Sequence, residues 1–358
     1  MKTLKFIVLL LMLSMTACHQ QESAFYRHVQ TSLSDTMPVP VYSLVSDTLC
    51  YDALWPTDIL TIDSFMLIAQ HKDKNLIHVY RLNDTTRIGA FLQKGGGPEE
   101  VAMWNGFTQY WKEGGEIKLL IQSYPNYVAI MNLTQTLSQN KVVYEKRFPF
   151  QSDSANVIMA RSNVVYKVDN RFLMSRAPER IGGLKDYNAC FQWFDYSSDK
   201  PGQVIYATDQ PLHPVPFLYT PGGVCFHPAK RKICFSCRFL NMFSLLDVDT
   251  GNATQFVPEN KVTDLDALVS EKKDATFLGD VAYTDKYLYL VNYGGISARE
   301  INKTNSKIEV YDWEGKHIST LSVPDPIYYI TVDNADRTLY AVVHNGGMKK
   351  YQLPLQIQ

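Results

Sequence analysis

From residue 39 to the C-terminus, the chain is a series of short apolar segments separated by Gly, Asp, Asn and Pro. Short runs rich in Val, Ile, Tyr and Phe, bounded by turn residues, are typical of β-strands, and no long stretch has the period of an amphipathic helix. The exception is 264–272, where we expect a short helix inserted between strands. The pattern therefore predicts an all-β fold.

The strands repeat in a fixed order. A turn or charged residue precedes an apolar strand at Asp63, Asn170, Lys232, Asp285 and Asp336. A second strand type follows around 76–82, 127–133, 190–196, 242–248, 307–313 and 348–353, at spacings of about 40 to 65 residues. A repeat of this length, built from four short strands, is typical of a propeller blade. Six such strands predict a six-bladed β-propeller with four-stranded blades.

The last repeat is one strand short. Its visible strands are 327–332, 338–343 and 348–353, and the chain ends soon afterwards. The apolar run at 39–45 belongs to no repeat, so we expect this N-terminal strand to complete the last blade and close the ring, which protects an open sheet edge. The predicted propeller spans 39–358.

The N-terminus has the pattern of an export signal. Lys2 and Lys5 precede an apolar run at 6–13 that is too short to span a bilayer. The sequence Ser-Met-Thr-Ala-Cys that follows resembles a bacterial lipobox, which implies a signal peptide at 1–17, lipidation of Cys18 with acyl chains such as palmitate, and a tether at 18–38. An ordinary signal peptide cut near Ala17 is the alternative. His19, rather than Asp, follows the cysteine, so we expect the outer membrane, with the leaflet left open.

The segment 91–101, Phe-Leu-Gln-Lys-Gly-Gly-Gly-Pro-Glu-Glu-Val, forms the joint between the first two repeats. It resembles the Gly-Arg-Gly-Pro-Gly-Glu-Phe-type joint of TolB-like six-bladed propeller lipoproteins of Gram-negative bacteria, which is related to NHL-like joints. Gly96, Gly97, Pro98, Glu100 and Val101 occupy comparable places, although Gly replaces the Arg of the pattern and Glu replaces its last Gly. The resemblance implies the fold and assigns no activity. We expect a positive φ within 95–97, where the chain turns sharply.

Motifs for catalysis, metal binding or phosphate binding are not found in the sequence. Lys94 precedes its glycines, which differs from a phosphate-binding loop, and no Gly-x-Ser-x-Gly or His-Glu-x-x-His occurs. A formal net charge of −1 does not favour nucleic acid as a partner. Cys234 and Cys237 lie in a strand and face opposite ways. If a hairpin is centred on 229–230, Cys225 lies opposite Cys234 and a disulfide could form. We expect no cofactor.

The candidate binding face follows from blade geometry. In an antiparallel four-stranded blade, the loops between strands 2 and 3 lie on the same face as the joints between blades. Two of these loops, 176–188 and 292–305, are long, and long loops often serve function. The candidate ligand-binding residues on these loops are His71, Tyr124, Arg176, Arg180, Arg238, Tyr293, Arg299 and His344. Their mixed basic and aromatic character suits a glycan, a peptide or an acidic small ligand.

The sequence therefore predicts a membrane-anchored lipoprotein of the cell envelope whose propeller binds a ligand or a partner protein without catalysis. The alternative is a hydrolase or lyase that uses the propeller channel and a metal on its axis. A catalytic site assembled from separate blades leaves no linear motif, so the assignment as a non-enzyme stays open. A third hypothesis is a structural subunit of an envelope complex.

Overall fold

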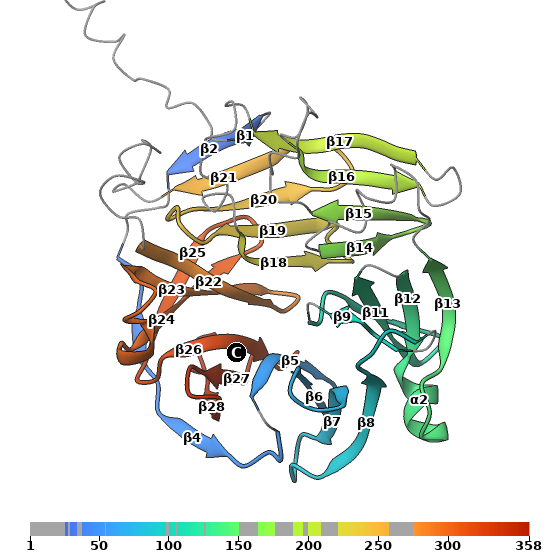
Figure 1. The fold of residues 1–358 in the computed structure, drawn as a ribbon. Helices are drawn as coiled ribbons and strands as arrows, with labels where there is room; N and C mark the ends of the chain where they lie inside the picture. Colours follow the sequence, from blue (N-terminus) through green and yellow to red (C-terminus); the bar gives the residue numbers. More distant parts are fainter. Residues whose placement is uncertain are drawn as a thin grey trace, which may run out of the picture.

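The computed structural model describes residues 26–27, 29–33, 38–53, 55–97, 100–104, 106–124, 127–149, 164–175, 189–195, 200–208, 221–257 and 275–357. Six β-sheets stand in a ring around a central axis, as Figure 1 shows. The prediction of a six-bladed β-propeller is confirmed. The expected helix at 264–272 and the signal peptide lie outside the described residues.

Each blade is an antiparallel meander that begins at the axis and ends at the rim. Blade 1 contains β5 (Pro56–Ile62), β6 (Phe65–Gln70), β7 (Asn75–Arg81) and β8 (Arg87–Gln93). Blade 2 contains β10 (Tyr110–Glu113), β11 (Glu116–Tyr124), β12 (Tyr127–Asn132) and β13 (Tyr144–Pro149), with β9 (Met103–Trp104) beside β11 and helix α2 (Leu133–Gln139) before β13. Blade 3 contains β14 (Val164–Val168), β15 (Arg171–Ser175), β16 (Ala189–Asp195) and β17 (Lys200–Thr208).

The second half of the ring follows the same plan. Blade 4 contains β18 (Pro221–His227), β19 (Lys232–Cys237), β20 (Phe243–Asp247) and β21 (Ala253–Val257). Blade 5 contains β22 (Ala275–Tyr283), β23 (Tyr287–Ser297), β24 (Ser306–Asp312) and β25 (His317–Val323), with a 3-10 turn, η2 (Ile301–Lys303), between β23 and β24. Blade 6 contains β26 (Ile327–Val332), β27 (Thr338–Val343) and β28 (Met348–Gln352).

The predicted repeat corresponds to the second and third strands of the blades. The turns before β6, β15, β19 and β27 contain a non-glycine residue in the left-handed region, with φ between 53° and 54° at Asp63, Asp169, Arg231 and Asp336. Asp tolerates this conformation better than most residues, which explains two of the turn residues seen in the sequence, Asp63 and Asp336. Neighbouring blades cover both faces of the middle strands, and all six residues of β12 are buried.

Four N-terminal strands form a belt around the rim: β1 (Tyr26–Arg27), β2 (Val29–Leu33), β3 (Val41–Ser43) and β4 (Ser46–Leu49). They pair in turn with the outer strands of blades 3, 4, 5 and 6, as the blue strands in Figure 1 show. The strand that completes blade 6 is β4, antiparallel to β28. The N-terminal segment thus closes the ring as expected, but the predicted run at 39–45 contributes β3 to blade 5. Strands β1 and β2 lie within the segment expected to be tether.

The joint between blades 1 and 2 differs from the prediction in its backbone. None of Gly95, Gly96 and Gly97 has φ in the left-handed region; Leu92, with φ 61°, takes that conformation instead. The Glu100 side chain folds back over the joint and accepts a hydrogen bond of 2.8 Å from the Gly97 amide. A Cβ on Gly95 would lie 2.0 Å from Glu100 Oε2. Glycine is therefore needed here to leave room for the carboxylate, rather than for a positive φ.

The hairpin between β18 and β19 has the expected register, with Cys225 directly opposite Cys234. Both cysteines are buried free thiols. Burial, followed by the neighbouring Cys234, raises the pKa of Cys225 well above its usual range. A thiol that stays protonated is a poor nucleophile, so this pair is part of the packed core in this state.

Candidate functional site

The central channel is the place where all six blades meet. It contains a cavity of about 200 Å³ that is lined by the innermost strand of every blade or by the residues next to it. The lining residues are 58–61, 107–110, 164, 224–225, 280–283, 329–332 and 334. Four aromatic rings, those of Phe107, Tyr110, Tyr283 and Tyr329, form part of this wall. The charged side chains in the lining are two carboxylates, Asp58 and Asp280.

Bulges in the innermost strands position both carboxylates. The register with the second strand shifts between Pro56 and Asp58 in β5, and between Leu278 and Val281 in β22. A bulge re-aims the side chains beside it, which directs these acids into the channel instead of into the space between blades. Related shifts occur in β18 and β26.

Backbone amides hold the two carboxylates in place. Asp58 Oδ1 accepts a hydrogen bond of 2.8 Å from the Ile59 amide, and Asp58 Oδ2 accepts one of 2.6 Å from the Phe107 amide of the next blade. Gly106, with φ 105°, allows this approach, because a Cβ there would lie 2.4 Å from Asp58 Oδ2. Asp280 Oδ2 accepts a hydrogen bond of 2.9 Å from the Ile330 amide in blade 6.

Enclosure by the channel wall disfavours the charged form of both acids. Burial raises the pKa of Asp280 to about 7. Smaller effects lower this pKa: hydrogen bonds from the Ile330 and Val281 amides and the charge of Arg238. Burial and then the Asp280 carboxylate raise the pKa of Asp58 well above its usual range. Two carboxyl groups that repel each other in a site of low dielectric retain a proton near neutral pH. The channel therefore holds a carboxyl pair that can exchange a proton.

The channel has two ends, and we call the end on the face of the loops between strands 2 and 3 its mouth. The joint of blade 1 is on this face as predicted, since the Lys94 amide donates to the Lys74 carbonyl in the neighbouring loop. Near Asp280, the Tyr293 hydroxyl donates to the Ile327 carbonyl at 3.0 Å. Asp280, Arg238 and Tyr328 all influence the pKa of Tyr293, which burial raises above its usual range.

The other side of the mouth is aromatic. The His344 ring lies 4.7 Å from the Tyr328 ring, and Tyr328 is 39% exposed. Trp55 is 53% exposed and carries the Lys72 ammonium 4.1 Å above its ring. Gly346 of blade 6 lies beside Trp55, so the loops of blades 1 and 6 adjoin. Burial lowers the pKa of His344, which favours the neutral ring at pH 7.

Three of the predicted ligand-binding residues lie near Tyr328: Tyr293 and Arg238 influence each other electrostatically beside it, and His344 packs against its ring. Their role in binding stays a prediction. His71 lies on the loop of blade 1, where burial and then the Lys94 ammonium lower its pKa. Arg299 is exposed beyond the end of β23. Tyr124 ends β11 on the same face. Arg176, Arg180 and the lipidation site Cys18 lie outside the described residues.

The two channel acids, Asp58 and Asp280, were not among the residues predicted from the sequence. An aspartate inside an apolar strand is the signal that could have found them, since Asp58 lies in Pro-Thr-Asp-Ile-Leu-Thr-Ile and Asp280 follows Phe-Leu-Gly. An acidic side chain costs free energy in such a strand unless it faces a polar space. Two further pockets lie outside the channel, between blades 1 and 2 and between blades 4 and 5.

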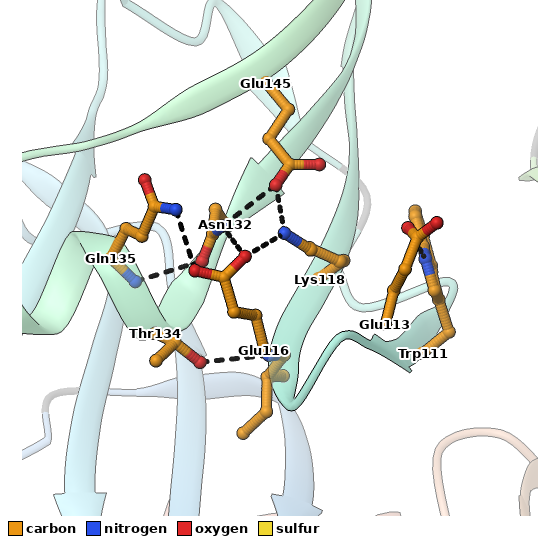
Figure 2. A network of polar contacts seen from close by, with 9 residues as sticks. Trp111, Glu113, Glu116, Lys118, Asn132, Thr134, Gln135 and Glu145 are labelled. Carbon is orange, nitrogen blue, oxygen red and sulfur yellow. Dashed lines mark hydrogen bonds and ion pairs between the residues drawn. The ribbon is translucent and has the colours of Figure 1, made fainter.

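A polar network at the start of β11 is satisfied from within, as Figure 2 shows. The nearly buried Lys118 ammonium forms ion pairs with Glu116, at 2.6 Å, and with Glu145. Asn132, which caps α2, donates to both carboxylates, and Gln135 donates to Glu116 at 2.7 Å. These contacts tie α2 to its blade. Among the described residues, no group of three or more His, Cys, Asp or Glu side chains is arranged to hold a metal ion.

Comparison with known proteins identifies the fold. A member of the DUF4221 family from Bacteroides vulgatus superimposes with a TM-score of 0.55 and 9% identity, over 88% of this chain and 98% of that one. A protein from Bacteroides fragilis predicted to be exported superimposes with a TM-score of 0.50 and 14% identity, over 91% of this chain and 99% of that one. No family model matches the sequence. No curated protein matches it either.

Identities this low support the fold alone. The relation to TolB-like and NHL-like propellers stays a prediction. Within the described residues, no helix is long and apolar enough to cross a membrane.

Proposed function

We propose that this protein is a lipid-anchored lipoprotein of the cell envelope whose propeller binds a ligand or a partner protein at the channel mouth, without catalysing a reaction. The observation that carries the proposal is the state of two nitrogen-bearing side chains there, the Arg238 guanidinium and the His344 imidazole. Arg238 Nε and His344 Nε2 are buried and have no hydrogen-bond partner in the described part of the chain. Buried polar atoms without partners are costly, so a ligand that forms hydrogen bonds with them would stabilise the site.

The exposed rings of Trp55 and Tyr328 support the same conclusion. Aromatic and arginine side chains at the centre of a face dominate the free energy of many interfaces. A propeller is a rigid ring, so these groups are held in place before the ligand arrives, which lowers the entropic cost of binding.

The address of the protein is the second part of the proposal. The lipobox-like sequence that ends at Cys18 supports export and anchoring through acyl chains. The shared fold with a protein predicted to be exported is consistent with this address. Because His19 rather than Asp follows Cys18, we expect attachment to the outer membrane. Separation of inner and outer membranes tests this expectation.

The test compares two faces of the propeller. The double variant Arg238→Ala/His344→Ala alters the channel mouth, and Arg337→Ala removes an exposed cation from a strand 1–2 turn on the opposite face. Wild-type and variant proteins are purified from membranes, and the bound proteins and glycans are identified. We expect a specific partner that the double variant loses and Arg337→Ala keeps. Equal recovery with both variants would contradict the assignment of the site.

The channel enzyme with an axial metal is the second candidate, favoured by the two carboxylates that converge in the cavity. Metal analysis of the purified protein separates the two functions. One divalent ion per chain that is lost from the double variant Asp58→Asn/Asp280→Asn would support the enzyme.

A further inference from the structure

We propose that the channel takes an ammonium group of its ligand, which Asp58 and Asp280 hold between the innermost strands of blades 1, 5 and 6. The inference rests on the proposed binding function and adds the chemical class of the ligand. The group is either a free small amine or a lysine side chain that a partner inserts from the mouth.

The charge of the cavity supports a cation. The two charged side chains that line it, Asp58 and Asp280, are both acidic, although the net charge of the whole chain is only −1. Arg238 is close enough to lower the pKa of Asp280, but within the described residues it makes no ion pair with either carboxylate. Opposite charges attract more strongly in a narrow site with little water than at the surface. A positive ligand group would therefore relieve the repulsion within the acid pair.

The acceptors in the cavity match the donors of an ammonium group. An ammonium group has three N–H donors, and Asp58 Oδ1, Asp58 Oδ2 and Asp280 Oδ2 can each accept more than the one amide hydrogen bond that the structure shows for them. Thr108 lies in the same cavity wall. Its hydroxyl oxygen is buried and has no hydrogen-bond partner among the described residues.

The ring of Tyr329 lies close to both acids, since both carboxylates, after burial and Tyr328, raise its pKa. An aromatic ring beside a cation adds attraction through its electron-rich face. The same ring contributes apolar wall, so the alkyl chain that carries an amine would also be accommodated.

Binding should release a proton. The charged and titratable groups around the pair are Arg238 from the loop after β19, Tyr293 from β23, Tyr328 and Tyr329 from β26, and Tyr110, Cys225 and Tyr283 in the cavity wall. Arginine is a permanent cation near neutral pH. Burial raises the pKa of the Tyr110, Tyr283, Tyr293 and Tyr329 hydroxyls and of the Cys225 thiol, so these groups stay neutral there. Between pH 6 and pH 8, the titrating group at the site is therefore the acid pair. An ammonium ion favours two ionised carboxylates and displaces the proton that the pair retains.

The test uses isothermal titration calorimetry with two matched pairs of probes. One pair is n-butylamine and n-butanol, and the other is Nα-acetyl-lysine-methylamide and its norleucine counterpart, which lacks the side-chain amine. We expect the amines to bind and their neutral partners not to bind. Binding of the free amine alone indicates a small-molecule ligand, whereas binding of the lysine derivative indicates an inserted side chain.

The protein variants test the residues. The double variant Asp58→Asn/Asp280→Asn should weaken amine binding by about 10- to 100-fold, the effect of hydrogen bonds to charged groups. Asp73→Asn removes a carboxylate from the same face outside the channel and should have no effect. If the double variant does not fold, wild-type protein still decides, because release of one proton should tighten binding by about tenfold from pH 6 to pH 8.

Equal affinity for amine and alcohol, no amine binding at millimolar concentration, or a flat pH profile would overturn the inference. A partner that is lost with Arg238→Ala/His344→Ala but does not compete with amines would leave the proposed function standing and reject the ammonium site alone. A partner that both Arg238→Ala/His344→Ala and Asp58→Asn/Asp280→Asn retain would reject the proposed function.

Discussion

Leu44 anchors the belt that closes the ring, and its truncation tests whether the belt belongs to the cooperative fold. Leu44 is 7% exposed and packs in the cluster between blades 5 and 6, with Val323 and Tyr351. Its amide donates to the Ser322 carbonyl at 2.9 Å. Leu→Ala substitutions in protein cores cost about 2–5 kcal/mol of unfolding free energy. The belt lies at the rim and can relax inward, so we expect the lower end, about 2–3 kcal/mol.

The neighbouring residue provides a matched control. Val45 is 84% exposed, so Val45→Ala should change stability by less than about 0.5 kcal/mol. Urea denaturation measures both variants, and hydrogen exchange of the β4 and β28 amides reports whether the belt opens locally. In Leu44→Ala these amides should exchange faster than in Val45→Ala. Identical midpoints and identical exchange in the two variants would show that the belt is not part of the cooperative structure.

Three further predictions concern single residues. Burial raises the pKa of Asp280 to about 7, above its value in the unfolded chain, so this group makes the wild type lose stability as the pH rises from about 4 to 7. Asp280→Asn should flatten this part of the stability profile, measured by urea titrations at each pH. An unchanged slope would contradict the raised pKa of Asp280. Asp336→Ala should destabilise the protein by about 3 kcal/mol, because Asp336 accepts buried hydrogen bonds from Thr284 and Tyr289, whereas Asp336→Asn, which keeps an acceptor and tolerates the turn, should lose less in thermal melts. Cys18→Ala should move the protein from the membrane to the soluble fraction, and retention in the membrane would reject lipidation as the anchor.

The blades could be predicted from the sequence because their signals are local. The turn before a second strand, as at Asp63 or Asp336, and the apolar run that follows it lie within about ten residues of each other. Hairpin register also follows from the turn, which is why Cys225 and Cys234 were placed opposite each other correctly. Strand order alone also placed the joint of blade 1 beside the loop between strands 2 and 3.

The role of the glycines in the joint between blades 1 and 2 could not be predicted from the neighbouring sequence. The glycines at 95–97 suggested a positive φ, but their role depends on the Glu100 side chain that folds back onto them. Glycine serves both backbone freedom and close approach, and the sequence does not distinguish the two uses.

By itself, the sequence determined the all-β class, the number of blades and the order of strands within each blade, because turn chemistry and alternation act between near neighbours. Only the tertiary structure decided how the ring closes and what its axis contains. The belt pairs residues 46–49 with 348–351, and Asp58 of blade 1 and Asp280 of blade 5 line the same channel cavity. Contacts between the two ends of a chain depend on how whole blades pack around the axis, and no local pattern records that arrangement.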